Sequence, residues 1–149
     1  MSLYNVFDVA GSAMSAQNLR LNTTASNLAN ANSVSSSAGE TYRARHPVFA
    51  TQLQQAMQGR PGRESLMQED SAVGVKVMGI VEDETPLIVE YSPNHPMADE
   101  EGYIYKPNVN VMEEMANMMS ASRSYQTNVQ IADSTKQLLS RTLRMGQNQ

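Results

Sequence analysis

Cysteine and tryptophan are absent from this 149-residue chain, and only two phenylalanines are present. The lack of cysteine excludes disulfides, cysteine-ligated metals and cysteine nucleophiles. Leu, Ile, Val and Phe make up 28 residues, 19% of the chain, just under the ~20% below which chains struggle to fold alone. The 11 methionines pack adaptably against irregular neighbours. This composition disfavours a compact enzyme and favours order that depends partly on partners.

Long apolar runs and basic clusters are also missing. No run is long enough to span a bilayer, and the first basic residue is Arg20. Neither direct membrane insertion nor a cleaved signal peptide is therefore expected. With a net charge of −4 and scattered basic residues, the chain has no electrostatic footprint for nucleic acid.

Catalytic and metal-binding motifs do not occur. There is no nucleophile elbow, phosphate loop, zinc-peptidase motif or dinucleotide fingerprint. His46 and His95 each precede proline without other metal-ligand residues in a recognisable spacing, so a loop role is expected. The acidic triplets 82–84 and 99–101 lack calcium-loop spacing and resist the burial that catalytic acids need. We predict no cofactor, no metal site and no enzymatic activity.

Charge divides the chain into three parts. Residues 1–39 contain only two charged side chains, Asp8 and Arg20. Ten of the fifteen acidic residues lie between positions 64 and 101, with Lys76 as the only base there. After Met115 the sign reverses, and the charged residues are Arg123, Lys136, Arg141 and Arg144 against Asp133 alone.

The first part has a helical period. Apolar residues recur every seven positions, at Phe7, Met14, Leu21 and Leu28. This spacing predicts a helix from about residue 3 to about residue 30, roughly 40 Å long. The composition of Ser33–Gly39 is typical of a linker.

A heptad pattern runs through the C-terminal part. Ten positions between 111 and 143 alternate by steps of four and three, and eight of them are apolar or aromatic. Asn110 and Glu113 form a variant of the capping box, and Gly146 is expected to end the helix. A period of 3.5 over ~35 residues indicates a coiled-coil strand.

Between these helices the period changes to two. Val73, Val75 and Val77 alternate, and residues 87–91 and 103–105 are two further β-rich runs, which predicts strands. Residues 47–58 are compatible with a short helix or with irregular structure.

Each predicted helix has an apolar stripe that its own segment cannot cover. Antiparallel pairing of residues 1–32 with 108–146 as a coiled coil closes one face, which leaves 33–72 as a linker or irregular segment and 73–107 as a small β-rich insert. The predicted fold class is α+β. The remaining helix faces are expected to pack against other subunits, and such heterologous contacts build helical arrays when they do not close. The candidate subunit-packing residues are Phe7, Met14, Leu21, Leu28, Val111, Met115, Met118, Tyr125, Val129, Leu139 and Leu143.

One Asn-rich stretch reads Ala25-Ser26-Asn27-Leu28-Ala29-Asn30-Ala31. It resembles the signature near the amino terminus of the bacterial flagellar rod and hook protein family. Residues 5–13, Tyr42-Arg43-Ala44, 107–110 and 119–126 are also similar to that family. Together with the short length, they resemble its proximal rod members.

The resemblance implies a structural subunit of the flagellar basal body. Such a subunit leaves the cytoplasm uncleaved through the flagellar type III export apparatus. It then assembles in the periplasm into a hollow shaft that transmits torque and surrounds the export channel. The implied partners are other rod subunits, copies of the chain itself and the adaptor protein between the rod and the membrane ring.

Asn27 and Asn30 lie on one face of the first helix, and two interpretations stay open. Buried between subunits, their amides hydrogen-bond across helices and fix the register. Alternatively, they belong to a fraying terminal turn.

Two other function classes compete with the rod subunit. One is a soluble coiled-coil adaptor that presents the β insert to a partner. The other is an enzyme, for which only the acidic insert could host chemistry.

Overall fold

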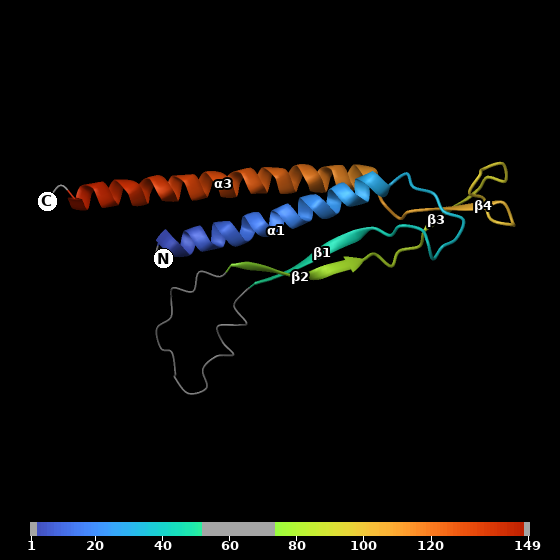
Figure 1. Cartoon of the computed structure of the whole chain (residues 1–149), viewed down its shortest axis with the longest axis horizontal. Coiled ribbons are helices and arrows are strands. Elements are labelled where there is room, and N and C mark those ends of the chain that lie inside the picture. Colours follow the sequence, from blue (N-terminus) through green and yellow to red (C-terminus); the bar gives the residue numbers. More distant parts are fainter. Residues whose placement is uncertain (1–2, 52–73, 148–149) are drawn as a thin grey trace, which may run out of the picture. The chain divides into compact units, whose positions relative to one another are not determined.

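The computed structural model describes residues 3–51 and 74–147 of the chain. The elements, in chain order, are α1 (Leu3–Asn30), β1 (Arg45–Thr51), β2 (Val75–Glu82), β3 (Ile88–Tyr91), β4 (Tyr103–Lys106) and α3 (Val111–Gln147). Figure 1 shows them along the chain. In the described residues, two helices and two small sheets give an α+β architecture, as the sequence predicts.

The described residues divide into two compact units. The first unit contains the described residues of 1–18, 49–78 and 122–149, and the second contains residues 19–48 and 79–121. Both helices therefore contribute to both units, whereas the β3–β4 hairpin belongs entirely to the unit formed by 19–48 and 79–121. We call this the second unit.

Helix α1 has the bounds that its period predicts. Its last turn is closed locally, because Asn30 Nδ2 donates to the carbonyl of Ser26 at 2.8 Å. The carbonyl of Asn30 in turn accepts hydrogen bonds from the backbone N–H and the hydroxyl of Ser33. These contacts end the helix at the start of the serine-rich segment.

Helix α3 begins where the capping residue predicts. The side-chain oxygen of Asn110 accepts the N–H groups of Met112 at 3.2 Å and of Glu113 at 3.4 Å. The expected stop at Gly146 is wrong, since the helix continues to Gln147. One glycine costs a helix only about 1 kcal/mol relative to alanine, so it weakens the last turn without ending it. Among the described residues, neither helix is long and apolar enough to cross a membrane.

The strands form two two-stranded sheets, β1 with β2 and β3 with β4. β2, β3 and β4 lie in the runs predicted as strands, but β1 is a correction. The sequence suggested a short helix or irregular structure from residue 47, whereas Arg45–Thr51 is extended and paired with β2. Pairing with β2 overrides the local preference of this segment. Each strand of a two-stranded sheet has one unpaired edge, where Pro47, which has no N–H to donate, is tolerated. Residues 52–58 lie outside the described part, and the predicted domain borders stay a prediction.

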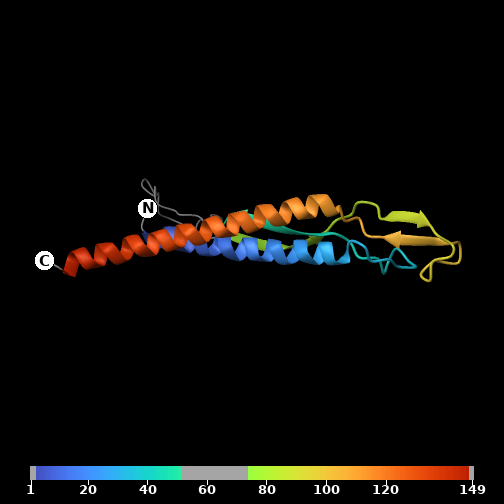
Figure 2. The same cartoon turned by 90° about the horizontal axis from the view of Figure 1, so that it is seen from above.

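The β3–β4 hairpin is antiparallel, with Val89 opposite Tyr105 and Tyr91 opposite Tyr103; Figure 2 shows the two strands side by side. Its loop depends on Gly102, which has φ +86°. A Cβ at this position would lie 2.9 Å from the Tyr91 ring and 3.1 Å from Pro93 Cβ. The glycine therefore lets the loop turn and lets the Tyr91 ring lie against the backbone.

We expect Gly102→Ala to lower the free energy of unfolding by about 1–3 kcal/mol, because it adds backbone strain and a clash with Tyr91. Urea unfolding followed by tyrosine fluorescence measures this. The matched control is Gly79→Ala, where a Cβ meets nothing within 4 Å. Equal losses in both variants would contradict this account of the hairpin.

Candidate functional site: the Asn27 junction and the helix faces

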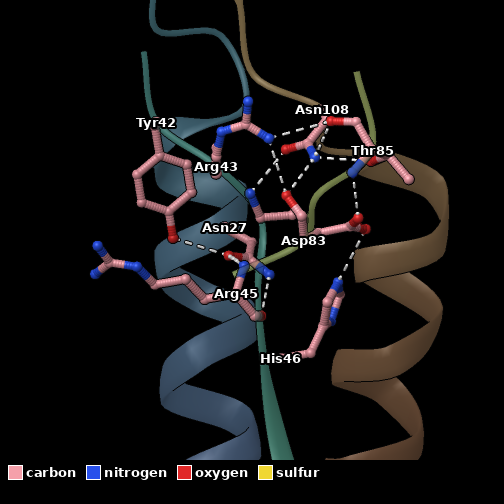
Figure 3. Close-up of polar contacts among 9 residues, drawn as sticks. Asn27, Tyr42, Arg43, Arg45, His46, Asp83, Thr85 and Asn108 are labelled. Atoms are coloured by element: carbon pink, nitrogen blue, oxygen red, sulfur yellow. Dashed lines mark hydrogen bonds and ion pairs between the residues drawn. The ribbon is translucent and has the colours of Figure 1, made fainter. Parts of the chain in front are cut away.

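A buried amide joins α1 to β1. Asn27 is 0% exposed, and its Nδ2 donates to the carbonyl of Arg45 at 2.9 Å. Its Oδ1 accepts the Arg45 N–H at 3.0 Å and the Tyr42 hydroxyl at 2.8 Å. The amide thus satisfies both main-chain groups of one residue of β1, in the second unit (Figure 3).

A second amide completes the same region. Asn108 Oδ1 accepts the N–H of Ala44 at 2.8 Å. Its Nδ2 lies 3.2 Å from the carbonyl of Asp83, 3.1 Å from that of Thr85 and 2.8 Å from the Thr85 hydroxyl. The Asp83 N–H donates to the carbonyl of Ala44 at 2.8 Å. We call Asn27, Tyr42, Ala44, Arg45, Asp83, Thr85 and Asn108 the Asn27 junction.

Charged side chains surround the junction. The Arg45 guanidinium lies 5.5 Å from the Tyr42 ring centroid and pairs with Glu82 at 3.0 Å. Arg43 Nη1 donates to the carbonyls of Asp83 and Thr85. These groups are half-exposed or exposed, so their ion pairs contribute little to stability, and the buried Asn27 amide and the half-buried Asn108 amide carry the junction.

Asp83 is a charged acceptor within it. The Thr85 N–H donates to Asp83 Oδ1 at 2.8 Å, and His46 Nε2 lies 3.8 Å from Oδ2. Hydrogen bonds from the backbone and side chain of Thr85 lower the pKa of Asp83 from its usual 3.8, and the charges of His46 and Arg43 lower it further. The structure therefore favours the ionised carboxylate.

The two asparagines of the Asn-rich motif have different roles. Asn27 binds the backbone of β1 in its own chain, so it does not lie in a fraying turn. Asn30 does belong to the terminal turn, through its bond to Ser26, and Ser26 Oγ lies 3.3 Å from the Tyr42 hydroxyl. The exposed motif residues are Ala25 and Ala29, and Leu28 and Ala31 are half-buried.

Small and polar residues occupy the covered face of each helix. In α3, Glu114, Ala121 and Thr135 are buried at seven-residue multiples, on one helical face. In α1 the buried residues are Ala10, Ala16, Thr23, Thr24 and Asn27. The buried row of α3 therefore lies one position before the row of the predicted heptad that contains Met115.

The predicted subunit-packing residues flank these stripes and stay accessible. Phe7 is 47% exposed, Val111 40%, Met115 51% and Leu143 62%. The others, Met14, Leu21, Leu28, Met118, Tyr125, Val129 and Leu139, are half-buried. None of these eleven residues is fully buried in the structure.

Sequence reasoning missed the roles of Tyr42 and Asn108. Both lie in stretches that resemble the rod and hook family, and this resemblance was the sequence signal that marked them. Their partners are main-chain groups and another amide, however, and no residue pattern identifies such partners. Among the described residues, no three His, Asp or Glu side chains gather as metal ligands would.

Comparison with known proteins gives two family matches. The model "Flagella basal body rod protein" matches residues 7–35, and "Flagellar basal body rod FlgEFG protein C-terminal" matches residues 100–145. The matches include Asn27 and Asn108 and cover most of both helices.

Curated relatives match over nearly the whole chain. The chain is 47% identical to the flagellar basal-body rod protein FlgC of Yersinia enterocolitica and 44% identical to that of Salmonella typhimurium, each over 99% of this chain and 100% of the relative. It is 33% identical to the FlgC of Borreliella burgdorferi over 93% of each.

Replacing Asn27 tests the junction. We expect Asn27→Ala to lower the free energy of unfolding by about 3 kcal/mol, because it leaves buried main-chain groups of Arg45 unpaired. Asn30→Ala is the matched control and should cost about 1 kcal/mol or less, since it removes one local bond at a helix end. Urea unfolding followed by circular dichroism compares them. A cost for Asn27→Ala no larger than that of the control would refute the junction.

The Asp83 pKa gives a pH test. Because the folded pKa lies below the usual 3.8, Asp83 contributes stability that is present above that value and is lost as pH falls through the folded pKa. Wild type should therefore be more stable than Asp83→Asn at pH 6, and the gap should be smaller at a pH well below 3.8. Urea midpoints at both pH values measure it. A gap that stays constant with pH would contradict the assignment.

Proposed function

This chain belongs to the flagellar basal-body rod protein family, and on that premise we propose that it forms the proximal part of a hollow helical shaft. Its family makes it a structural subunit of the flagellar basal-body rod, located in the basal body, and not an enzyme. The proposal concerns how its surfaces build the shaft.

One observation carries the proposal: the fully buried residues of the helices are small or polar, whereas several large apolar residues of the helices are exposed. A soluble monomer rarely exposes a large contiguous apolar patch. Here Phe7, Met115 and Leu143 are each about half exposed or more, while alanine and threonine line the covered stripes. Neighbouring subunits would cover this apolar surface, and methionine adapts to neighbours that differ in sequence.

We propose that α1 and α3 pair as a coiled coil through their small residues. A hydrogen bond from Arg20 Nη2 to Asn117 Oδ1, 2.8 Å long, supports this arrangement within the second unit. Small side chains permit close approach of two helices, which leaves the flanking apolar rows free for contacts between subunits. Such heterologous contacts generate a helical array when they do not close.

The Asn27 junction suits the transmission of torque. It links α1 to β1, and β1 to the 83–85 turn through Asn108, by several part-buried hydrogen bonds. A rotational load on one element is then passed to the next through fixed bonds rather than through a flexible linker. The proposed partners are the other rod subunits, further copies of this chain and the adaptor between the rod and the membrane ring, with the flagellar type III export apparatus acting during secretion.

The low charge of residues 1–39 supports a second role in the shaft. Only two charged side chains occur there, so a channel surface built from this segment would offer exported chains few electrostatic contacts. We propose that part of α1 faces the export channel.

Motility tests the packing surfaces. We expect Met115→Asp to abolish swimming, because it places an unpaired charge in a dry contact between subunits. The free energy of unfolding of the isolated chain should change by less than about 1 kcal/mol, since Met115 is 51% exposed and exposed substitutions have small effects. The assay is soft-agar spreading of a strain whose own rod gene is replaced, together with electron microscopy of its basal bodies.

The matched control is Gln130→Asp, which adds the same charge at an exposed polar position of α3. It should leave swimming intact. Normal swimming with Met115→Asp would remove this residue from the packing surface, and loss of swimming with both variants would mean that any added charge on α3 is disruptive.

A further inference from the structure

Half of the tyrosines in the chain lie on one face of the β3–β4 hairpin. The chain has six tyrosines, and the register places Val89 opposite Tyr105 and Tyr91 opposite Tyr103. Directly paired residues share a face, so these four side chains form one surface, which we call the tyrosine face. Tyr91 is 64% exposed, Val89 54% and Tyr103 38%.

The tyrosine face is held in one conformation. The Tyr91 and Tyr103 rings meet edge to face with centroids 5.2 Å apart, and Gly102 leaves room for the Tyr91 ring. On the other edge of β4, Ser35 and Tyr105 exchange two main-chain hydrogen bonds of 3.0 Å. A rigid aromatic surface loses little conformational entropy on binding.

The hairpin is strongly acidic. Residues 88–106, which form the hairpin, contain four acidic residues and one base. Glu100 and Glu101 are exposed and closely precede Tyr103, while Lys106 is already paired with Glu90. The complementary partner of the hairpin therefore offers apolar groups to the tyrosine face and basic groups to the neighbouring Glu100 and Glu101.

The last turns of α3 have that chemistry. After Asp133 every charged residue is basic. Leu138, Arg141 and Met145 follow the i, i+3, i+7 spacing of one helical face. Leu138 is 53% exposed and Met145 76%. Arginine binds aromatic faces through cation–π contacts, and methionine sulfur packs favourably against aromatic rings.

We propose that the tyrosine face of one copy binds the last turns of α3 in a second copy. Within α3, 30 residues separate Arg141 from Val111, about 45 Å of helix at 1.5 Å per residue. No proline interrupts α3, so the helix has no sharp kink that would return its end to its own start. The two surfaces differ, so the contact is head to tail and propagates along an array.

This inference rests on the proposal that copies of the chain assemble, and it adds which surfaces meet. Because the chain has no cysteine, single cysteines report contacts without background. The experiment expresses two full-length copies with different tags in a strain that lacks its own rod gene, one carrying Val89→Cys and the other Met145→Cys. Oxidation of swimming cells then yields a disulfide-linked heterodimer if the surfaces meet.

The matched control pairs Val89→Cys with Met112→Cys. Met112 lies on the same helix and is equally exposed, at 76%, but it is next to Glu113 rather than to basic residues. We expect the 89–145 heterodimer to exceed the 89–112 heterodimer by about tenfold or more, because docking raises the effective concentration of the two thiols.

Charge exchange supplies the second readout. Arg141→Glu with Arg144→Glu should reduce the 89–145 product about tenfold, and Glu100→Lys with Glu101→Lys in the Val89→Cys copy should restore it. Equal 89–145 and 89–112 yields in swimming cells would overturn the inference and leave the rod function intact. A strong 89–145 product whose yield does not change on charge reversal would also overturn it. Cells that never swim with the unmodified chain would instead refute the proposed function.

Discussion

The architecture of the second unit depends on side-chain amides that substitute for main-chain partners. Where α1, β1 and the 83–85 turn meet, no continuous ladder can pair every backbone group, and a buried unpaired group is costly. Asn27 supplies both a donor and acceptors to this region, and Asn108 does the same from the segment before α3. An amide suits this role because one short side chain carries both kinds of hydrogen-bonding atom.

The helices depart from the usual division between an apolar inside and a polar outside. Ala121 is completely buried in α3, while Met112 and Met145 on the same helix are three-quarters exposed. If neighbouring subunits cover these residues, as proposed, their binding stabilises the folded protomer by mass action. The low content of large aliphatic residues and the high methionine content are two further signs of the same arrangement.

Much of this structure was accessible from the sequence. The seven-residue period predicted both helices, Asn110 predicted the start of α3, and alternation predicted β2, β3 and β4. In α3 the buried residues Glu114, Ala121 and Thr135 each lie one position before a predicted heptad position, because a heptad pattern identifies apolar rows without identifying which row the same chain covers. Strand β1 was missed because its pairing with β2 and its bonds to Asn27 are long-range. The Asn27 partner was missed because a main-chain atom has no signature in a sequence.

A hydrogen bond between a side chain and a main-chain group restricts the amino-acid identity of only one of its two residues. Asn27 contacts Arg45 through the N–H and the carbonyl, groups that every amino acid except proline provides. The arginine side chain, which pairs with Glu82, can be replaced without breaking the two hydrogen bonds between Asn27 and the main chain of residue 45. We therefore expect unequal mutational tolerance at the two ends of this contact: position 27 needs a side chain that both donates and accepts, whereas position 45 needs only its main-chain groups, and its side chain can change with a changing neighbour.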